Sequence, residues 1–202
     1  TDVTLEAKGF LKKEITDTLG KFGSILSGHP TIEVPGIEVN TGALGHGLSI
    51  GVGMALAAKM DKRDYKTFVM MGDGEQGEGS IYEAAMAGHQ YKLDNLVAII
   101  DRNHLQISGN TEDVMAIEDI AARWTAFGWD VKRMDGDDME DIMKTFAAID
   151  YTNHKPHLLI SNTTKGKGVS YMENVAKWHH GMPSEEQYRQ ALSEIDERIK
   201  NL

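Results

Sequence analysis

An acidic turn between two apolar stretches places the strongest constraint on the fold of this chain. Residues 66–71 form an apolar run of strand length, and Gly72-Asp73-Gly74-Glu75 follows it directly. The next apolar run covers residues 95–101, with Asn103 just after it, and residues 80–91 between the two runs have the spacing of a helix. We therefore expect two parallel strands whose carboxyl ends present Asp73 and Asn103 at one edge of an α/β sheet, where such sheets bind ligands.

The residue types at this edge suit a small divalent cation. A carboxylate, a side-chain amide oxygen and a backbone carbonyl are hard oxygen donors, which Mg²⁺ takes while it also binds phosphate oxygens. Gly72 and Gly74 allow the backbone to turn sharply and to approach a ligand closely. On the Gly-Asp-Gly turn alone, however, an ordinary strand-to-helix turn with an exposed acid is the better interpretation, because short glycine motifs are common by chance.

The composition excludes several classes of function. The chain has 202 residues, 41% hydrophobic and 26% charged, with a net charge of −10. Nucleic acids attract basic surfaces, so this acidic balance argues against a nucleic-acid partner. The sequence contains no cysteine, which excludes disulfides and thiolate metal sites. We expect no membrane association, because no apolar run reaches the length of a membrane span, and we expect a cytoplasmic protein.

The remaining signals alternate between helices and strands. We expect helices around residues 12–19, 44–59, 117–127, 139–149 and 184–202, and strands at 129–134 and 157–161. Asp137 is expected to cap the helix after it, and Ser184-Glu185-Glu186-Gln187 has the pattern of a capping box. We find no repeat or linker and expect one domain over residues 1–202, with a doubly wound, mostly parallel sheet that carries helices on both faces.

The expected helix over residues 44–59 is unusually rich in glycine and alanine. Glycine is about 1 kcal/mol less favourable than alanine in an exposed helix, so we interpret this helix as packed closely against another helix or a cofactor. The preceding Thr41-Gly42-Ala43-Leu44 would place free backbone N–H groups where an anionic phosphate can bind.

Motifs along nearly the whole chain resemble those of the transketolases. The acidic turn, the segment Glu78-Gly79-Ser80-Ile81-Tyr82-Glu83-Ala84 and Asn103 are similar to the thiamine diphosphate and metal motif of that family. So many ordered matches are highly specific, and they resemble in particular the N-terminal subunit of transketolases split into two polypeptides. The further matches are Ser27-Gly28-His29-Pro30, residues 35–45, Thr164-Lys165-Gly166-Lys167-Gly168-Val169-Ser170 and Trp178-His179.

The resemblance implies thiamine diphosphate as cofactor, together with Mg²⁺, Ca²⁺ or Mn²⁺. Asp73, Asn103 and the backbone carbonyl of Leu105 would bind the metal. Arg102 stands where many thiamine enzymes have a further asparagine, and His46 stands where a glutamine is usual. The residues that would contact the cofactor are Gly42, Leu44, Gly72, Asp73, Gly74, Glu75, Asn103, Leu105, Lys165 and His179.

The resemblance also implies catalytic roles for two histidines and two glutamates. His29 and His179 would contact substrate hydroxyls and transfer protons, a role that suits imidazoles near neutral pH. The neighbouring His180 leaves a shift of one residue open. Glu78 and Glu83 would take part in a carboxylate network between the active sites of a dimer, where close acids titrate jointly.

By resemblance, the enzyme would transfer a two-carbon ketol unit from a ketose phosphate to an aldose phosphate, as in the pentose phosphate pathway. In this family the glutamate that protonates the aminopyrimidine ring lies on a pyrimidine-binding domain. We therefore expect a partner subunit with pyrimidine-binding and C-terminal domains, and a heterotetramer with two copies of each chain. The family's usual N-terminal segment, with another Ser-x-Gly-His motif, is absent from these residues, so we expect a truncated or proteolysed subunit.

Two other kinds of protein remain as alternatives. One is a different thiamine enzyme, such as a deoxyxylulose-phosphate synthase or an oxo-acid dehydrogenase E1 α-subunit. Glu75 and residues 35–44 favour a transketolase, because the alternatives usually differ there. The other is an assembly module without catalytic activity, which the missing upstream histidines would explain.

Overall fold

The computed structural model describes residues 1–201, and residue contacts divide the chain into two compact units, Thr1–Leu44 and Gly45–Leu202. That residues 1–202 form one domain stays a prediction. Leu202, the last residue of the expected C-terminal helix, lies outside the described residues.

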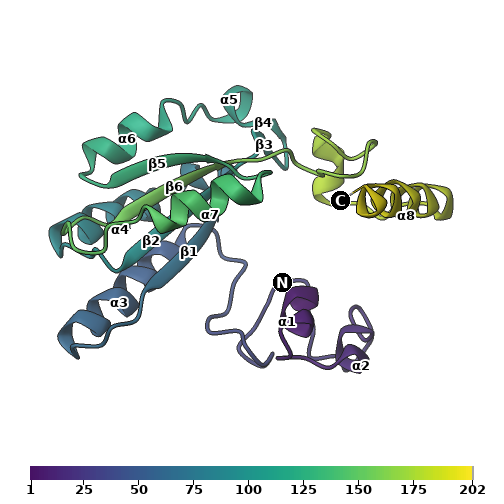
Figure 1. Ribbon diagram of the computed structural model, residues 1–202, viewed down its shortest axis with the longest axis horizontal. Coiled ribbons are helices and arrows are strands. Elements are labelled where there is room, and N and C mark those ends of the chain that lie inside the picture. The colour runs from purple at the N-terminus through teal and green to yellow at the C-terminus, as the bar shows by residue number, and fades with distance from the viewer. Residues whose placement is uncertain (202) are drawn as a thin grey trace. The chain divides into compact units, whose positions relative to one another are not determined.

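The second unit is built on a parallel four-stranded sheet in the order β1-β2-β6-β5 (Figure 1). In the register of β1 and β2, Gly72 pairs with Asp101, so these two strands end at the same level of the sheet. Helices pack on both faces, which confirms the expected fold class. The strands are β1 (Thr67–Gly72), β2 (Leu96–Arg102), β5 (Asp130–Asp135) and β6 (His157–Asn162).

Three helices share a core with one face of the sheet: α3 (His46–Met60), α4 (Gly79–Gln90) and α6 (Ile120–Ala126). This face holds most of the core, including Trp124 and Trp129, whose rings meet edge to face with centroids 4.7 Å apart. A Cβ added to Gly51 of α3 would lie 2.4 Å from Val69 Cγ2. Close packing on strand β1 therefore explains this glycine of the helix.

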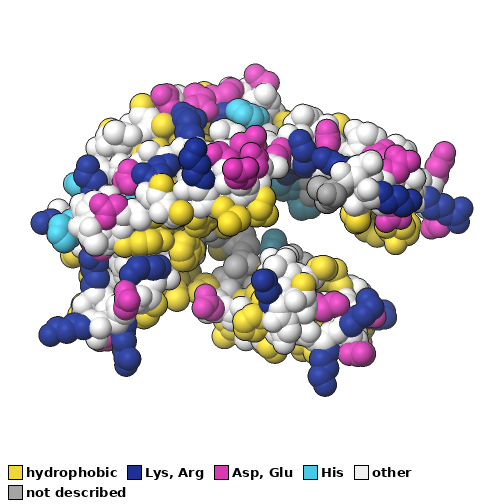
Figure 2. Space-filling model, in the orientation of Figure 1, with side chains coloured by type: hydrophobic (Ala, Val, Ile, Leu, Met, Phe, Trp, Pro, Cys, Tyr) yellow, Lys and Arg dark blue, Asp and Glu magenta, His cyan; other side chains and the backbone are white. Residues whose placement is uncertain are grey.

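A single helix, α7 (Met139–Ala147), packs on the other face around Val97, Leu159 and Met134. The ring of Phe146 lies 6.1 Å from that of Phe68 on the edge strand β1. Figure 2 shows apolar side chains gathered in this region, where exposed residues lie on α7 and β1. They are Phe68, Met70, Met139 and Met143.

Shorter elements complete the second unit. The antiparallel pair β3 (Leu105–Gln106) and β4 (Gly109–Asn110) was not predicted. In helix α8 (Glu185–Lys200) the predicted capping box is confirmed: Ser184 N donates to Gln187 Oε1 at 2.9 Å, and Gln187 N to Ser184 Oγ at 3.2 Å. The remaining elements are η1 (Gly74–Gly77), α5 (Thr111–Val114) and η2 (Ala176–His179).

Two sequence predictions about helix starts are wrong. Helix α3 begins at His46 rather than at residue 44, and Gly45 is its N-cap. Asp138, not Asp137, caps α7, and its Oδ1 accepts from Glu140 N at 2.9 Å. The carboxylate of Asp137 instead accepts from Thr164 N at 3.1 Å, so it binds the segment after β6 rather than the first turn of α7.

The first unit contains two short helices, α1 (Asp2–Ala7) and α2 (Lys13–Thr16), around a small core of Leu11, Leu26 and Val34. The helix expected over residues 12–19 is reduced to one turn. The hydroxyl of Thr18 donates to Ile15 O at 2.6 Å, a local bond that competes with helix continuation. Among the described residues of both units, no helix is long and apolar enough to cross a membrane.

Candidate functional site

The carboxyl ends of β1 and β2 bring Asp73 and Asn103 to one edge of the sheet, as predicted. Asp73 N donates to Asp101 O at 3.2 Å, which joins the two chain segments just beyond the strands. The side chain of Asp73 is only 1% exposed, and Asn103 is also buried. An ordinary turn with an exposed acid is therefore the wrong interpretation. A buried carboxylate needs hydrogen bonds or a cation, because burial penalises its charge.

Three donors hold the Asp73 carboxylate in a fixed orientation. Its Oδ2 accepts from His104 N at 2.6 Å and from Arg102 Nη1 at 3.0 Å, and its Oδ1 accepts from Gly74 N at 2.7 Å. Each carboxylate oxygen has two lone pairs, so Oδ1 keeps one for a further ligand. The side-chain oxygen of Asn103 accepts from Leu105 N at 3.0 Å and likewise keeps one. The two side chains thus retain hard oxygen donors of the kind that Mg²⁺ binds.

The sequence did not reveal that Arg102 is the central cation of this edge. Its side chain is 1% exposed, and Nη1 donates to Thr111 Oγ1 at 2.8 Å as well as to Asp73. Nη2 donates to Glu112 Oε1 at 3.0 Å and to Glu118 Oε1 at 2.8 Å. An arginine at the end of a buried strand is expected to pair with acidic side chains, but the sequence alone does not identify them.

The pKa of Glu118 reflects this pairing. Partial burial raises the pKa of its carboxyl, but the hydrogen bond from Ile120 N and the hydrogen bonds and charge of Arg102 outweigh it. The pKa of Glu118 therefore lies below its ordinary value, and the carboxylate stays ionised beside Arg102 at neutral pH.

Glu75 ties the end of β1 to the start of α3. Its Oε2 accepts from Gly72 N at 3.0 Å, and its Oε1 accepts from Gly45 N at 2.7 Å. Gly74 lies so close to the β3–β4 segment that an added Cβ would be 2.7 Å from Gln106 Cβ. This turn therefore needs glycine at position 74 and a carboxylate at position 75 for its own structure.

Glu78 and Glu83 lie at the amino-terminal end of α4, and both are exposed. Glu78 is the N-cap residue, and it lies beside Gly45 at the start of α3. Ser80 Oγ donates to Gly45 O at 3.0 Å, which fixes the two helix starts against each other. The two glutamates are therefore on the surface of the second unit, next to a rigid junction.

Lys165 and His179 come from the long connection between β6 and α8. Lys165 is half-buried, and its carbonyl accepts from Asn174 N at 2.9 Å. Partial burial of the imidazole, helped by the nearby charges of Lys165 and His180, holds the pKa of His179 below its ordinary value. The rings of His179 and His180 lie 4.8 Å apart. At neutral pH, His179 is thus a neutral imidazole that can accept a proton.

The other predicted residues, His29, Gly42 and Leu44, belong to the first unit. A Cβ added to Gly42 would lie 2.8 Å from His29 Cγ, so the imidazole packs directly on the Gly42 backbone. The side chain of Leu44 is exposed. Within this unit, the structure therefore brings His29 and Gly42 together.

A family model assigns the chain to a class of cofactor-binding domain. The model described as "Transketolase, thiamine diphosphate binding domain" matches residues 8–195. A solved transketolase from Campylobacter jejuni has the same fold, with a TM-score of 0.84 and 34% identity over 91% of this chain and 30% of that one. The sheet with its Asp73 edge is thus a thiamine diphosphate-binding domain.

Curated relatives narrow this class to a family. The chain is 78% identical to an apulose-4-phosphate transketolase subunit of Phocaeicola vulgatus, over 99% of its own length and 71% of that protein. It is 37% identical to a 6-deoxy-6-sulfo-D-fructose transketolase subunit of a Clostridium species, over 95% of this chain and 70% of that protein. The chain belongs to the transketolase family and is an N-terminal, thiamine diphosphate-binding subunit of the split type. The matches favour neither the other thiamine enzymes nor an assembly module without activity.

Proposed function

We propose that this chain is the thiamine diphosphate-binding subunit of a two-subunit transketolase that acts on apulose 4-phosphate. The observation that carries the proposal is the 78% identity, over 200 residues, to a subunit named for that substrate. The reaction would move a two-carbon ketol unit from this ketose phosphate to an aldose phosphate. A 6-deoxy-6-sulfo sugar is the second candidate, but the relative named for it is only 37% identical.

The proposed metal ligands are Asp73, Asn103 and the backbone carbonyl of Leu105. The support for them is the lone pair left on Asp73 Oδ1 and on the Asn103 side-chain oxygen, at a buried edge where hard oxygen donors converge. We take Mg²⁺ as the metal, with Ca²⁺ or Mn²⁺ as substitutes. The cation would bind the cofactor's diphosphate, and the cofactor, when bound, supplies a nucleophilic thiazolium carbon and an electron sink.

The proposed cofactor contacts surround this edge. Gly72 and Gly74 are proposed to approach the diphosphate with their backbone, and Glu75 holds Gly72 in place by accepting from its N–H. Lys165 would contribute a positive charge near the anionic cofactor. Gly42 and Leu44 would contact the cofactor from the first unit.

His29 and His179 are proposed to contact the sugar and to move protons to and from its hydroxyl groups. His179 suits this task because its lowered pKa keeps the imidazole neutral and able to accept a proton. For His29, the support is its contact with Gly42, one of the proposed cofactor residues.

The proposed partner is a C-terminal subunit that carries the pyrimidine-binding and C-terminal domains, in an assembly with two copies of each chain. The support for a partner is that two relatives of this chain are each named as one subunit of a transketolase. The exposed apolar side chains of α3 and α4 suit an interface with the second copy, and Glu78 and Glu83 are exposed at the amino-terminal end of α4. These apolar residues are Ile50, Met60 and Met86.

The test of the function is reconstitution. This chain, its C-terminal subunit, thiamine diphosphate and Mg²⁺ should convert apulose 4-phosphate in the presence of an aldose phosphate, and omission of any component should abolish turnover. Faster turnover of 6-deoxy-6-sulfo-D-fructose under the same conditions would overturn the proposed substrate.

The Asp73→Ala variant should lose Mg²⁺-dependent cofactor binding in calorimetry of the complete enzyme, and unchanged affinity would refute the metal assignment.

Light scattering of the co-expressed subunits tests the assembly. We expect a mass equal to two copies of each chain, and Ile50→Glu should reduce it to that of one pair by placing a charge in the interface. A one-to-one complex with full activity would contradict the proposal.

A further inference from the structure

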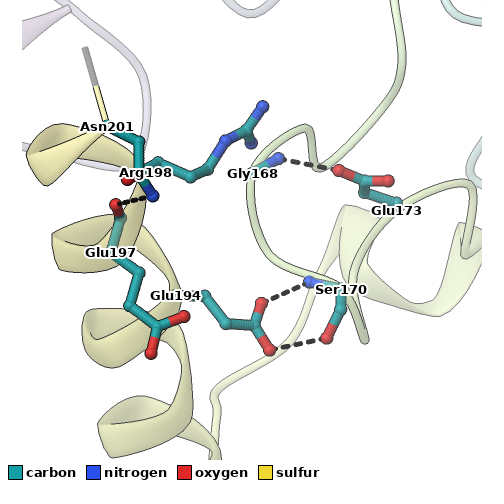
Figure 3. Close-up of a pocket in the computed structure, with 7 residues that line it drawn as sticks. All are labelled: Gly168, Ser170, Glu173, Glu194, Glu197, Arg198 and Asn201. Carbon is teal, nitrogen blue, oxygen red and sulfur yellow. Dashed lines mark hydrogen bonds between the residues drawn. The ribbon is translucent and has the colours of Figure 1, made fainter.

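The connection between β6 and α8, which carries Lys165 and His179, is hydrogen-bonded to helix α8. A pocket of about 330 Å³ lies between the two. Figure 3 shows Glu194 of α8, which reaches across to Ser170 of the connection. Ser170 N donates to Glu194 Oε2 at 2.7 Å, and Ser170 Oγ donates to Glu194 Oε1 at 2.6 Å. Both carboxylate oxygens therefore hold the same residue, which fixes its backbone as well as its side chain.

Gln190 reinforces this contact from the preceding turn of α8. Its Nε2 donates to Glu194 Oε1 at 2.7 Å and to Ser170 Oγ at 3.2 Å. The hydrogen bonds from Ser170 and Gln190 hold the pKa of Glu194 below its ordinary value. The carboxylate is therefore ionised at neutral pH, where it accepts hydrogen bonds most strongly.

A chain of contacts leads from Ser170 to the residue beside His179. Tyr171 follows Ser170, and its hydroxyl donates to Gln187 O of α8 at 2.8 Å. The indole Nε1 of Trp178 donates to Tyr171 O at 2.9 Å, and the two aromatic rings lie 5.2 Å apart. The backbone of Tyr171 therefore fixes the position of the ring next to His179.

The other end of the connection is closed on itself. Asn174 N donates to Lys165 O at 2.9 Å, and Gly168 N donates to Glu173 Oε1 at 2.9 Å (Figure 3). These bonds close residues 165–174 into one compact loop. The contact of Glu194 with Ser170 is thus a point at which α8 can set the position of both Lys165 and Trp178.

We propose that Glu194 is a positioning residue of the transketolase reaction, which holds the Lys165 loop and the Trp178-His179 segment in the arrangement that the cofactor and the sugar require. This inference rests on the proposed function, because only that function gives Lys165 and His179 their roles. Glu194 would act through Ser170 and Tyr171 and touch neither cofactor nor substrate.

The test uses the complete two-subunit enzyme with thiamine diphosphate and Mg²⁺. In Glu194→Gln the amide keeps the size of the side chain but loses its charge, and an NH2 group in place of Oε1 cannot accept a hydrogen bond. The bond from Gln190 Nε2 is then lost, and the Ser170 hydroxyl can no longer donate to this group. We expect kcat to fall about tenfold, which corresponds to about 1.4 kcal/mol, while KM for the sugar changes less than threefold. Ser170→Ala removes only the hydroxyl, so it should give a smaller fall. Glu197→Gln is the matched control, since this side chain lines the same pocket and makes no hydrogen bond to the loop within the described residues.

Hydrogen exchange separates this inference from the proposed function. Amides of residues 165–180 should exchange faster in Glu194→Gln than in Glu197→Gln, while those of β1 and β2 stay protected. Unchanged exchange in this segment, or an equal fall of kcat in both variants, would overturn the positioning role. Absence of ketol transfer in the unmodified enzyme would refute the proposed function and with it the catalytic role of Glu194, whereas the exchange result would still show whether Glu194 holds the loop.

Discussion

Replacement of Arg102 by methionine should destabilise this chain strongly. The side chain of Arg102 is 1% exposed and donates to Asp73, Thr111, Glu112 and Glu118, so its removal leaves the equally buried Asp73 without its cation. Loss of one partner of a buried ion pair costs about 3–5 kcal/mol. For a chain of this size, each kcal/mol lowers Tm by about 2–4 °C, so Tm should fall by about 6–20 °C.

Urea unfolding measures this cost through the fluorescence of the buried Trp124 and Trp129. In the Arg102→Met background, Asp73→Asn should restore about 1–2 kcal/mol, because the two residues are in contact and the unpaired charge is removed. Arg133→Met is the control: its ion pair with Asp119 is exposed and should cost less than about 1 kcal/mol. A loss for Arg102→Met as small as that of the control, or no recovery with Asp73→Asn, would refute the reasoning.

Two further predictions concern the turn and the pH dependence. Gly74→Ala should lower the free energy of unfolding by about 1–3 kcal/mol, since its Cβ would lie 2.7 Å from Gln106 Cβ. Gly79→Ala is the control, because its Cβ meets open space and should not lower the free energy of unfolding. Equal urea midpoints for the two variants would contradict this prediction. The acid limb of the kcat/KM profile should lie below the ordinary imidazole pKa of about 6.5, because the pKa of His179 is lowered. Removal of the neighbouring charge in Lys165→Met should raise that pKa and move the limb to higher pH, and a limb that stays in place would exclude His179 as the titrating base.

The sequence predicted the parts of the fold that depend on local pattern. The apolar runs around Asp73 and Asn103 located the strand ends and their common edge, and the Ser184 pattern identified the start of α8. The predicted N-cap of α7 was wrong by one residue, because Asp137 and Asp138 are adjacent aspartates that can both cap a helix. Only the contact of Asp137 with Thr164 N, from a distant segment, distinguishes them.

The residue types of the candidate site could be predicted from the sequence, but the hydrogen-bond and ion-pair partners of these residues could not. Asp73 and Asn103 could be placed at one edge of the sheet because each follows an apolar strand, and the resemblance to the transketolases made them candidate ligands. The role of Arg102 could not, since its partner Glu118 comes from a segment after the unpredicted β3–β4 pair. Glu194 was also missed, because an exposed glutamate on an amphipathic helix has no sequence signal that distinguishes it from its neighbours.

The unit formed by β1, α4 and β2 has a consequence for how such an enzyme can be divided between genes. Asp73 and Asn103 directly follow the first and the second strand of one strand–helix–strand crossover, from Thr67 to Arg102, and their hydrogen-bond partners Gly74, His104 and Leu105 lie within or next to it. A division of the polypeptide anywhere outside this crossover leaves both proposed metal ligands on one chain. The chain that carries the crossover then holds both proposed ligands in position through its own hydrogen bonds, without a contribution from a partner subunit.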